Sequence, residues 1–106
     1  MRKSKYNNQK TVVNGIRFDS KREANRYCEL LLLARAGEIT NLQRQVRYTL
    51  IPKQDGERAC DYVADFVYTD KAGHTIVEDV KGAKTDVYKL KRKLMKWVHG
   101  ITVEEV

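Results

Sequence analysis

A three-residue loop, Lys71-Ala72-Gly73, constrains the fold of this chain more than any other feature of its sequence. It separates segments 60–69 and 74–81, which are both rich in the β-branched and aromatic residues typical of strands. A loop of this length with glycine in its last position predicts a hairpin closed by a type I turn and a G1 bulge. Residue 70 then pairs with residue 74, and residues 65 and 79 lie opposite each other.

This register places two carboxylates side by side. Asp65 and Asp79 would have Cβ atoms about 5 Å apart on one face of the hairpin, and Lys81 would follow two residues along that face. Two such carboxylates repel each other unless one holds a proton or a hard divalent cation such as Mg²⁺ lies between them. A lysine beside that ion can activate an attacking water. The alternative is an ordinary aspartate–lysine ion pair on a sheet face.

Other segments supply the remaining elements. Asn14-Gly15 predicts a tight turn within a small hairpin over 11–18. Ser20 and Glu23 form a capping-box pattern that begins a helix, which Gly37 ends. Because residues 30–33 are all leucine, we expect this helix to be buried on more than one side.

The second half of the chain predicts three strands and a second helix. The first strand is expected over 45–51, before the two strands of the hairpin, and the helix over 85–99, with Thr85 as its N-cap. Its expected apolar stripe consists of Val87, Leu90, Leu94 and Trp97. A short last strand is expected over 101–103. The order is helix, three strands, helix and strand, an α/β (α+β) architecture with a mixed central sheet flanked by helices.

The net charge of +7 is unevenly distributed along the chain. Residues 1–35 carry a net charge of +6 and residues 82–99 carry +5, whereas residues 36–81 carry −2. Basic segments predict a polyanionic partner such as nucleic acid. An acidic centre would repel phosphate unless it holds a metal ion, so this distribution favours a metal-dependent activity over simple binding.

Length and composition narrow the class of protein further. We expect one domain over residues 11–106, preceded by a flexible basic arm over residues 1–10. No apolar run approaches the roughly 20 residues of a membrane span, and the first ten residues do not resemble a secretory signal. Cys28 and Cys60 have no metal-ligand spacing. These features predict a reduced cytoplasmic protein.

Asp65 followed by Asp79-Val80-Lys81 on adjacent strands, before a basic helix, resembles the PD-(D/E)XK nuclease superfamily. The predicted order α-β-β-β-α-β is that of its restriction-endonuclease-like core. The segments FDSKREANRY, YVADFVY, VEDVKG and TDVYKLKRKL are similar to a family of small phage and prophage proteins assigned to this superfamily. The resemblance extends from about residue 5 to residue 106. If the chain is phage-encoded, as the resemblance implies, its expected location is the cytoplasm of the host cell.

The resemblance implies roles for particular residues. Asp65 and Asp79 would be the metal-binding acids, although Ala64 stands where the motif has proline, and Lys81 would be the catalytic lysine. The main-chain carbonyl of Val80 would also bind the metal. Glu23 matches the acid of the first helix, which acts through water or a second ion; its alternative role is the capping box. Glu78 points to the opposite face by strand alternation and is not chosen.

The expected function is a DNA endonuclease dependent on Mg²⁺ or Mn²⁺ that acts in phage recombination, replication or processing. Cleavage would be structure-directed, as in Holliday junction resolvases, or non-specific, and would leave 5′-phosphate and 3′-hydroxyl ends. A two-fold dimer would suit cleavage of both strands. The alternatives are a non-catalytic DNA-binding module with this fold and an RNA-directed nuclease. The residues expected to contact DNA are Lys21, Arg22, Lys84, Tyr88, Lys89, Lys91, Arg92, Lys93 and Lys96.

Overall fold

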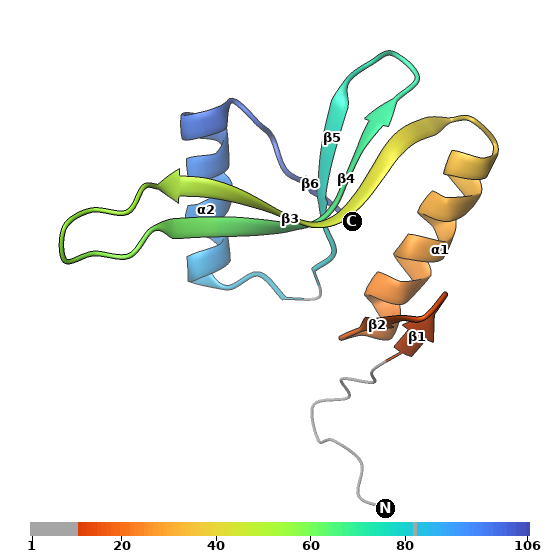
Figure 1. Ribbon diagram of the computed structural model, residues 1–106, viewed down its shortest axis with the longest axis horizontal. Helices are drawn as coiled ribbons and strands as arrows, with labels where there is room; N and C mark the ends of the chain where they lie inside the picture. Colours follow the sequence, from red (N-terminus) through yellow and green to blue (C-terminus); the bar gives the residue numbers. More distant parts are fainter. Residues whose placement is uncertain (1–10, 82) are drawn as a thin grey trace, which may run out of the picture.

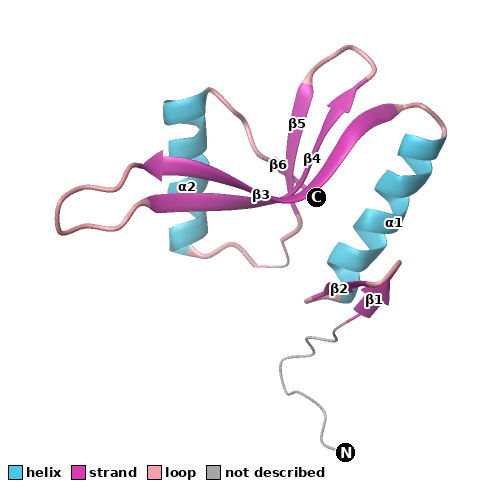
Figure 2. Ribbon diagram, viewed as in Figure 1, coloured by secondary structure: helices cyan, strands magenta, loops and turns pink. Residues whose placement is uncertain are grey.

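The computed structural model describes residues 11–81 and 83–106 of this mixed α+β protein. The predicted basic arm, residues 1–10, lies outside the described residues. The elements are β1 (Thr11–Val13), β2 (Ile16–Phe18), α1 (Lys21–Arg35), β3 (Ile39–Ile51), β4 (Cys60–Asp70), β5 (Thr75–Asp79), α2 (Asp86–His99) and β6 (Glu104–Glu105). Figures 1 and 2 show the long strands β3 and β4 between the two helices. No helix in this described part of the chain has the length and apolarity needed to cross a membrane.

Two sheets are present among the described residues. β1 and β2 form a hairpin in which Val13 pairs with Ile16, and the backbones of Asn14 and Gly15 both have positive φ, as the predicted tight turn requires. The main sheet has the order β3-β4-β5-β6. Its first two pairs are antiparallel and the β5–β6 pair is parallel. The main sheet is therefore mixed, as predicted.

The helices begin and end for the predicted reasons. The Ser20 hydroxyl accepts a hydrogen bond from the Glu23 N–H (3.1 Å), and the Thr85 hydroxyl accepts one from the Tyr88 N–H (3.1 Å). Gly100 has φ 69° and donates its N–H to the carbonyl of Lys96, which ends α2 in a left-handed cap.

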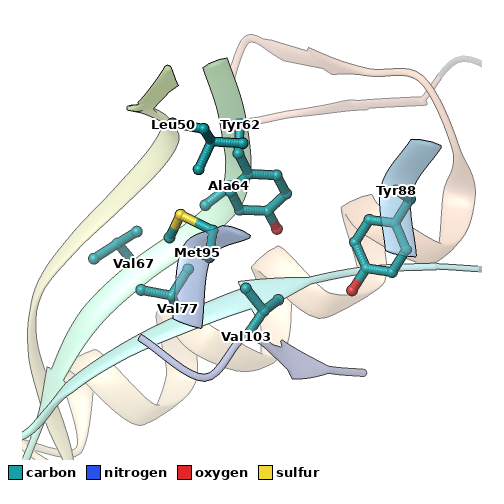
Figure 3. Close-up of a cluster of buried hydrophobic side chains, with 8 residues drawn as sticks. All are labelled: Leu50, Tyr62, Ala64, Val67, Val77, Tyr88, Met95 and Val103. Carbon is teal, nitrogen blue, oxygen red and sulfur yellow. The ribbon is translucent and has the colours of Figure 1, made fainter. Parts of the chain in front are cut away.

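The two helices pack on separate apolar clusters. α2 contributes Tyr88 and Met95 to a cluster with β3, β4 and β5, which Figure 3 shows around Tyr62 and Ala64. α1 contributes Ala24 and Leu30 to a second cluster, which also contains Phe66 from β4. Simple alternation would place Ala64 and Phe66 on one side of β4, yet they belong to different clusters. The alternation of β4 is therefore interrupted at Asp65: Tyr62 and Ala64 face the cluster under α2, whereas Phe66 and Tyr68 face the cluster under α1.

Three details of the predicted elements are wrong, one in helix burial and two in strand boundaries. On α1, Leu30 is buried but Leu32 and Leu33 are exposed, because the hairpin and the sheet cover only one face of this helix. The last strand is Glu104–Glu105 rather than 101–103, because these two glutamates are the residues that pair with the end of β5. β3 also begins at Ile39, six residues before the predicted start.

The predicted apolar stripe of α2 does not face the core. Val87, Leu90 and Trp97 are exposed, and only Leu94 packs in part against the cluster. The helix instead turns Tyr88 and Met95 toward the sheet. This rotation lets Met95 fill the space beside Ala64 and lets the Tyr88 hydroxyl reach Glu105 (2.7 Å).

Candidate catalytic site

The predicted hairpin register is confirmed. Val67 pairs with Val77 and Phe66 with Glu78, so the next positions place Asp65 opposite Asp79. The turn has the expected hydrogen bonds, with Asp70 N–H donating to the His74 carbonyl (2.9 Å) and Gly73 N–H to the Asp70 carbonyl (3.0 Å). The end of β5 is therefore held against the middle of β4, where the two aspartates meet.

Of the two aspartates, Asp79 is the more deeply buried, with 2% of its surface exposed. Its Oδ2 accepts a hydrogen bond of 2.5 Å from the Tyr62 hydroxyl. The Lys81 ammonium lies 3.3 Å from Oδ1, which is ion-pair range. That contact lacks hydrogen-bond geometry, so among the described residues Oδ1 is a buried oxygen without a hydrogen-bond partner. A buried acceptor of this kind is costly unless another ligand satisfies it.

Asp65 is fixed by the main chain of the opposing strand. Its Oδ2 accepts a hydrogen bond from the Val80 N–H (2.8 Å), and its Oδ1 lies 3.5 Å from the Gln45 amide nitrogen. Burial raises the pKa of Asp65, the Val80 hydrogen bond opposes this rise, and the charge of Asp79 adds to it. Val80 therefore lies at the predicted site, where its main-chain N–H contacts Asp65.

Glu23 reaches this pair from the first turn of α1. Its Oε2 lies 3.4 Å from the Gln45 amide nitrogen and 3.9 Å from Arg44 Nη2. Burial raises the pKa of Glu23 to about 7, and the charge of Asp65 contributes to the same rise. Glu23 serves the helix cap and the site at once. Its main-chain N–H donates to Ser20, and its carboxylate turns toward Gln45 on the sheet.

Gln45 and Tyr62 are parts of the site that the sequence did not predict. Gln45 has φ 52°, in the left-handed region that side chains other than glycine rarely adopt. This backbone directs its amide toward both Glu23 and Asp65. No motif of the sequence gives Tyr62 a role, yet its hydroxyl donates a hydrogen bond to Asp79, and burial raises its pKa. The aromatic residues of β4 gave no signal that distinguishes this hydroxyl from the others.

Glu78 points away from the site, as predicted from alternation. It is 1% exposed and accepts hydrogen bonds from Arg26 Nε (2.9 Å) and Nη2 (2.6 Å) on α1. The Tyr68 hydroxyl also donates to Glu78, and burial together with this bond raises the pKa of Tyr68 to about 12. This pair, buried at Glu78 and partly exposed at Arg26, attaches α1 to β5 on the side opposite Asp79.

An open cleft of about 290 Å³ lies beside Asp79 on the side of α2. Its walls come from the end of β5, from β4 and from the first turns of α2. The lining residues are Asp61, Tyr62, Val63, Asp79, Lys81, Thr85, Val87, Tyr88 and Lys91. The Lys81 ammonium lies 4.9 Å from the centre of the Tyr88 ring, a cation–π contact that holds the lysine over the cleft.

The predicted DNA-contacting residues divide into two groups. Lys84, Tyr88 and Arg92 all bind the Glu105 carboxylate of β6, at 3.0, 2.7 and 3.0 Å. The hydrogen bond from Tyr88, followed by that from Lys84, lowers the pKa of Glu105 to about 2. The second group is not joined to Glu105: Lys91 lines the cleft, and the exposed residues are Lys89, Lys93 and Lys96 on α2 and Lys21 and Arg22 in the first turn of α1.

The donor set fits a hard divalent cation. Asp65 and Asp79 offer carboxylate oxygens, and the buried Asp79 Oδ1 lacks a hydrogen-bond partner in the described residues. The Val80 carbonyl is the further oxygen ligand that the resemblance implies. Residues 11–81 and 83–106 contain no group of three or more His, Cys, Asp and Glu side chains arranged to hold a metal ion. A cation at this position would therefore need water or main-chain oxygens beside the two aspartates.

Comparison with known proteins gives one match. The profile of DUF1064, described as a protein of unknown function, matches residues 3–100. The chain belongs to this family. No curated protein and no solved structure matches the sequence or the fold.

Proposed function

We propose that this chain is a metal-dependent DNA endonuclease with a restriction-endonuclease-like core. The observation that carries the proposal is the buried Asp79 Oδ1, which has no hydrogen-bond partner in the described part of the chain and lies 3.3 Å from the Lys81 ammonium. Asp65 lies opposite Asp79, and the Gln45 amide links Asp65 to Glu23 on α1. The order α1-β3-β4-β5-α2-β6 supports it, because it is the α-β-β-β-α-β order of that core. Mg²⁺ or Mn²⁺ is the proposed cofactor.

The side chains have distinct tasks in this proposal. Asp65 and Asp79 would hold the cation, which supplies positive charge and Lewis acidity at the phosphate. Lys81 would orient the attacking water and neutralise charge that develops on the phosphate oxygens. Glu23, with its pKa raised to about 7, is suited to accept the proton of that water near neutral pH. The products would be 5′-phosphate and 3′-hydroxyl ends.

The surrounding charge suits a phosphate chain. Lysines and arginines lie on the first turn of α1, which also carries Glu23, and along α2, whose first turns line the cleft beside Asp79. Each phosphate that they neutralise would release counterions. We propose cleavage directed by DNA structure or without sequence preference, in phage DNA recombination, replication or processing. A cytoplasmic location and a two-fold dimer belong to the same proposal.

A nicking assay on supercoiled DNA tests the activity. The wild-type chain should cleave with Mg²⁺ or Mn²⁺ and not with chelator, and Asp79→Asn and Lys81→Met should each reduce the rate at least about 100-fold. The matched controls are Asp55→Asn and Lys53→Met, two exposed positions in the β3–β4 loop, which should cleave at the wild-type rate.

Binding measured in chelator separates the alternatives. A chain that binds DNA but never cleaves it, and whose Asp79→Asn variant behaves identically, is a DNA-binding module and overturns the proposal. Cleavage of an RNA oligonucleotide in preference to duplex, junction and single-stranded DNA would assign the site to RNA instead.

A further inference from the structure

α2 presents apolar side chains to solvent along one face. Val87, Leu90 and Trp97, here named the α2 stripe, are separated by three and seven residues and therefore lie on the same side of the helix. Trp97 is 85% exposed, and Val87 and Leu90 are each more than half exposed. Apolar residues gathered on one exposed face are typical of an interaction surface.

The charges around the α2 stripe restrict what can cover it. Lys89, Lys93 and Lys96 are exposed on the same helix, and Asp86 is the only acid among its 14 residues. Lys93 lies one turn before Trp97, so an ammonium and the indole ring are neighbours. A second copy of α2 laid along this face would bring like charges together, whereas a polyanion with apolar faces would satisfy both the lysines and the stripe.

The α2 stripe also continues from the candidate site. Val87 lines the same cleft as Asp79 and Lys81. Trp97 is ten residues further along the helix, a distance of about 15 Å at 1.5 Å per residue. A stacked nucleic-acid strand covers that distance with about four to five nucleotides. One strand can therefore occupy the cleft and reach the indole ring.

We propose that the α2 stripe binds single-stranded DNA, with an unpaired base stacked on Trp97 and the adjoining phosphates on Lys93 and Lys96. Duplex DNA keeps its bases stacked on each other, so it offers this surface only phosphates. Single strands therefore gain the stacking contact that duplexes lack. The assignment to DNA rests on the proposed function; the stacking itself rests on the exposure of the ring and the charges beside it.

Fluorescence tests this binding directly, because Trp97 is the only tryptophan in the chain. The wild-type protein is titrated in chelator, where no cleavage occurs, with an eight-nucleotide oligothymidine, a duplex of equal length and an oligouridine. The oligothymidine should quench the emission and bind more tightly than the duplex. Trp97→Ala, followed by fluorescence anisotropy of labelled DNA, should weaken single-strand binding by about 5- to 150-fold and leave duplex binding unchanged.

Controls separate stacking from charge. Leu32→Ala, an exposed apolar position on α1, should leave every affinity unchanged, Trp97→Phe should restore part of the single-strand affinity, and Lys93→Ala should weaken duplex and single strand alike. Absence of quenching, or equal loss of duplex and single-strand affinity in Trp97→Ala, would overturn the inference. Self-association that Trp97→Ala abolishes would assign the surface to a second copy, and stronger quenching by oligouridine would assign it to RNA. Because no cleavage is needed, failure here leaves the nicking assay intact, and failure of nicking leaves this assay intact.

Discussion

Replacing Arg26 by alanine should destabilise the protein more than any other change to a partly exposed residue of α1. The substitution removes two hydrogen bonds, of 2.9 and 2.6 Å, from a Glu78 carboxylate that is 1% exposed. Among residues 11–81 and 83–106, the Tyr68 hydroxyl is then the remaining hydrogen-bond donor to that charge. Breaking one partner of a buried ion pair costs about 3–5 kcal/mol. The exposed contact of Arg26 with Glu29 accounts for only a few tenths of this free energy.

The change is measurable by urea unfolding followed by far-ultraviolet circular dichroism. With a slope of about 1.5 kcal/mol per molar urea, the midpoint of Arg26→Ala should fall by about 2–3 M. Arg22→Ala, exposed one turn earlier on the same helix, should change the free energy of unfolding by less than about 0.5 kcal/mol.

A double-mutant cycle identifies the buried charge as the cause. In a Glu78→Gln background no carboxylate charge remains to be left unpaired, so Arg26→Ala should cost at least about 2 kcal/mol less than it does in the wild type. Equal costs in the two backgrounds, or a wild-type cost below about 1 kcal/mol, would refute the reasoning.

Two further predictions concern the candidate site. Gln45→Gly and Gln45→Ala both remove the side-chain amide, but only glycine adopts φ 52° without strain. In urea unfolding the glycine variant should therefore be more stable than the alanine variant by about 1 kcal/mol. Equal stabilities would contradict the left-handed backbone at this position. The raised pKa of Glu23 means that, without divalent cation, the folded chain holds a proton that the unfolded chain releases between pH 4.5 and about 7. Stability should therefore fall as the pH rises through this window, and Glu23→Gln should flatten the fall in urea midpoints measured at pH 5 and 7.5; an unchanged slope would show that Glu23 is not the group responsible.

The parts of the fold that the sequence predicted are those set by local chemistry. The three-residue loop before His74 leaves one register for β4 and β5, and Ser20 and Thr85 mark the starts of both helices. The meeting of Asp65 and Asp79 followed from that loop alone. Local signals of this kind need no knowledge of the rest of the molecule.

The parts that were missed depend on contacts between distant segments. The connection between β3 and β4 contains a tight turn at Gln54–Glu57. The pairing of the two strands nevertheless shifts register twice, so that turn alone does not place Gln45 beside Asp65. The rotation of α2 depends on the hydrogen bond from the Tyr88 hydroxyl to Glu105 of β6, a residue that follows the helix in the sequence. The pattern of apolar residues in α2 is the same whether that face is covered by the sheet or left in solvent.

The exposure of Trp97 also decides which spectroscopic signal reports which process. A ring that is 85% exposed in the folded chain changes its surroundings little when the chain unfolds, so its emission is a poor measure of folding. Backbone circular dichroism reports the folding of the chain, and indole emission reports binding to the α2 stripe. A single sample therefore yields two independent readings, and a variant that alters one without the other distinguishes a damaged surface from a damaged fold.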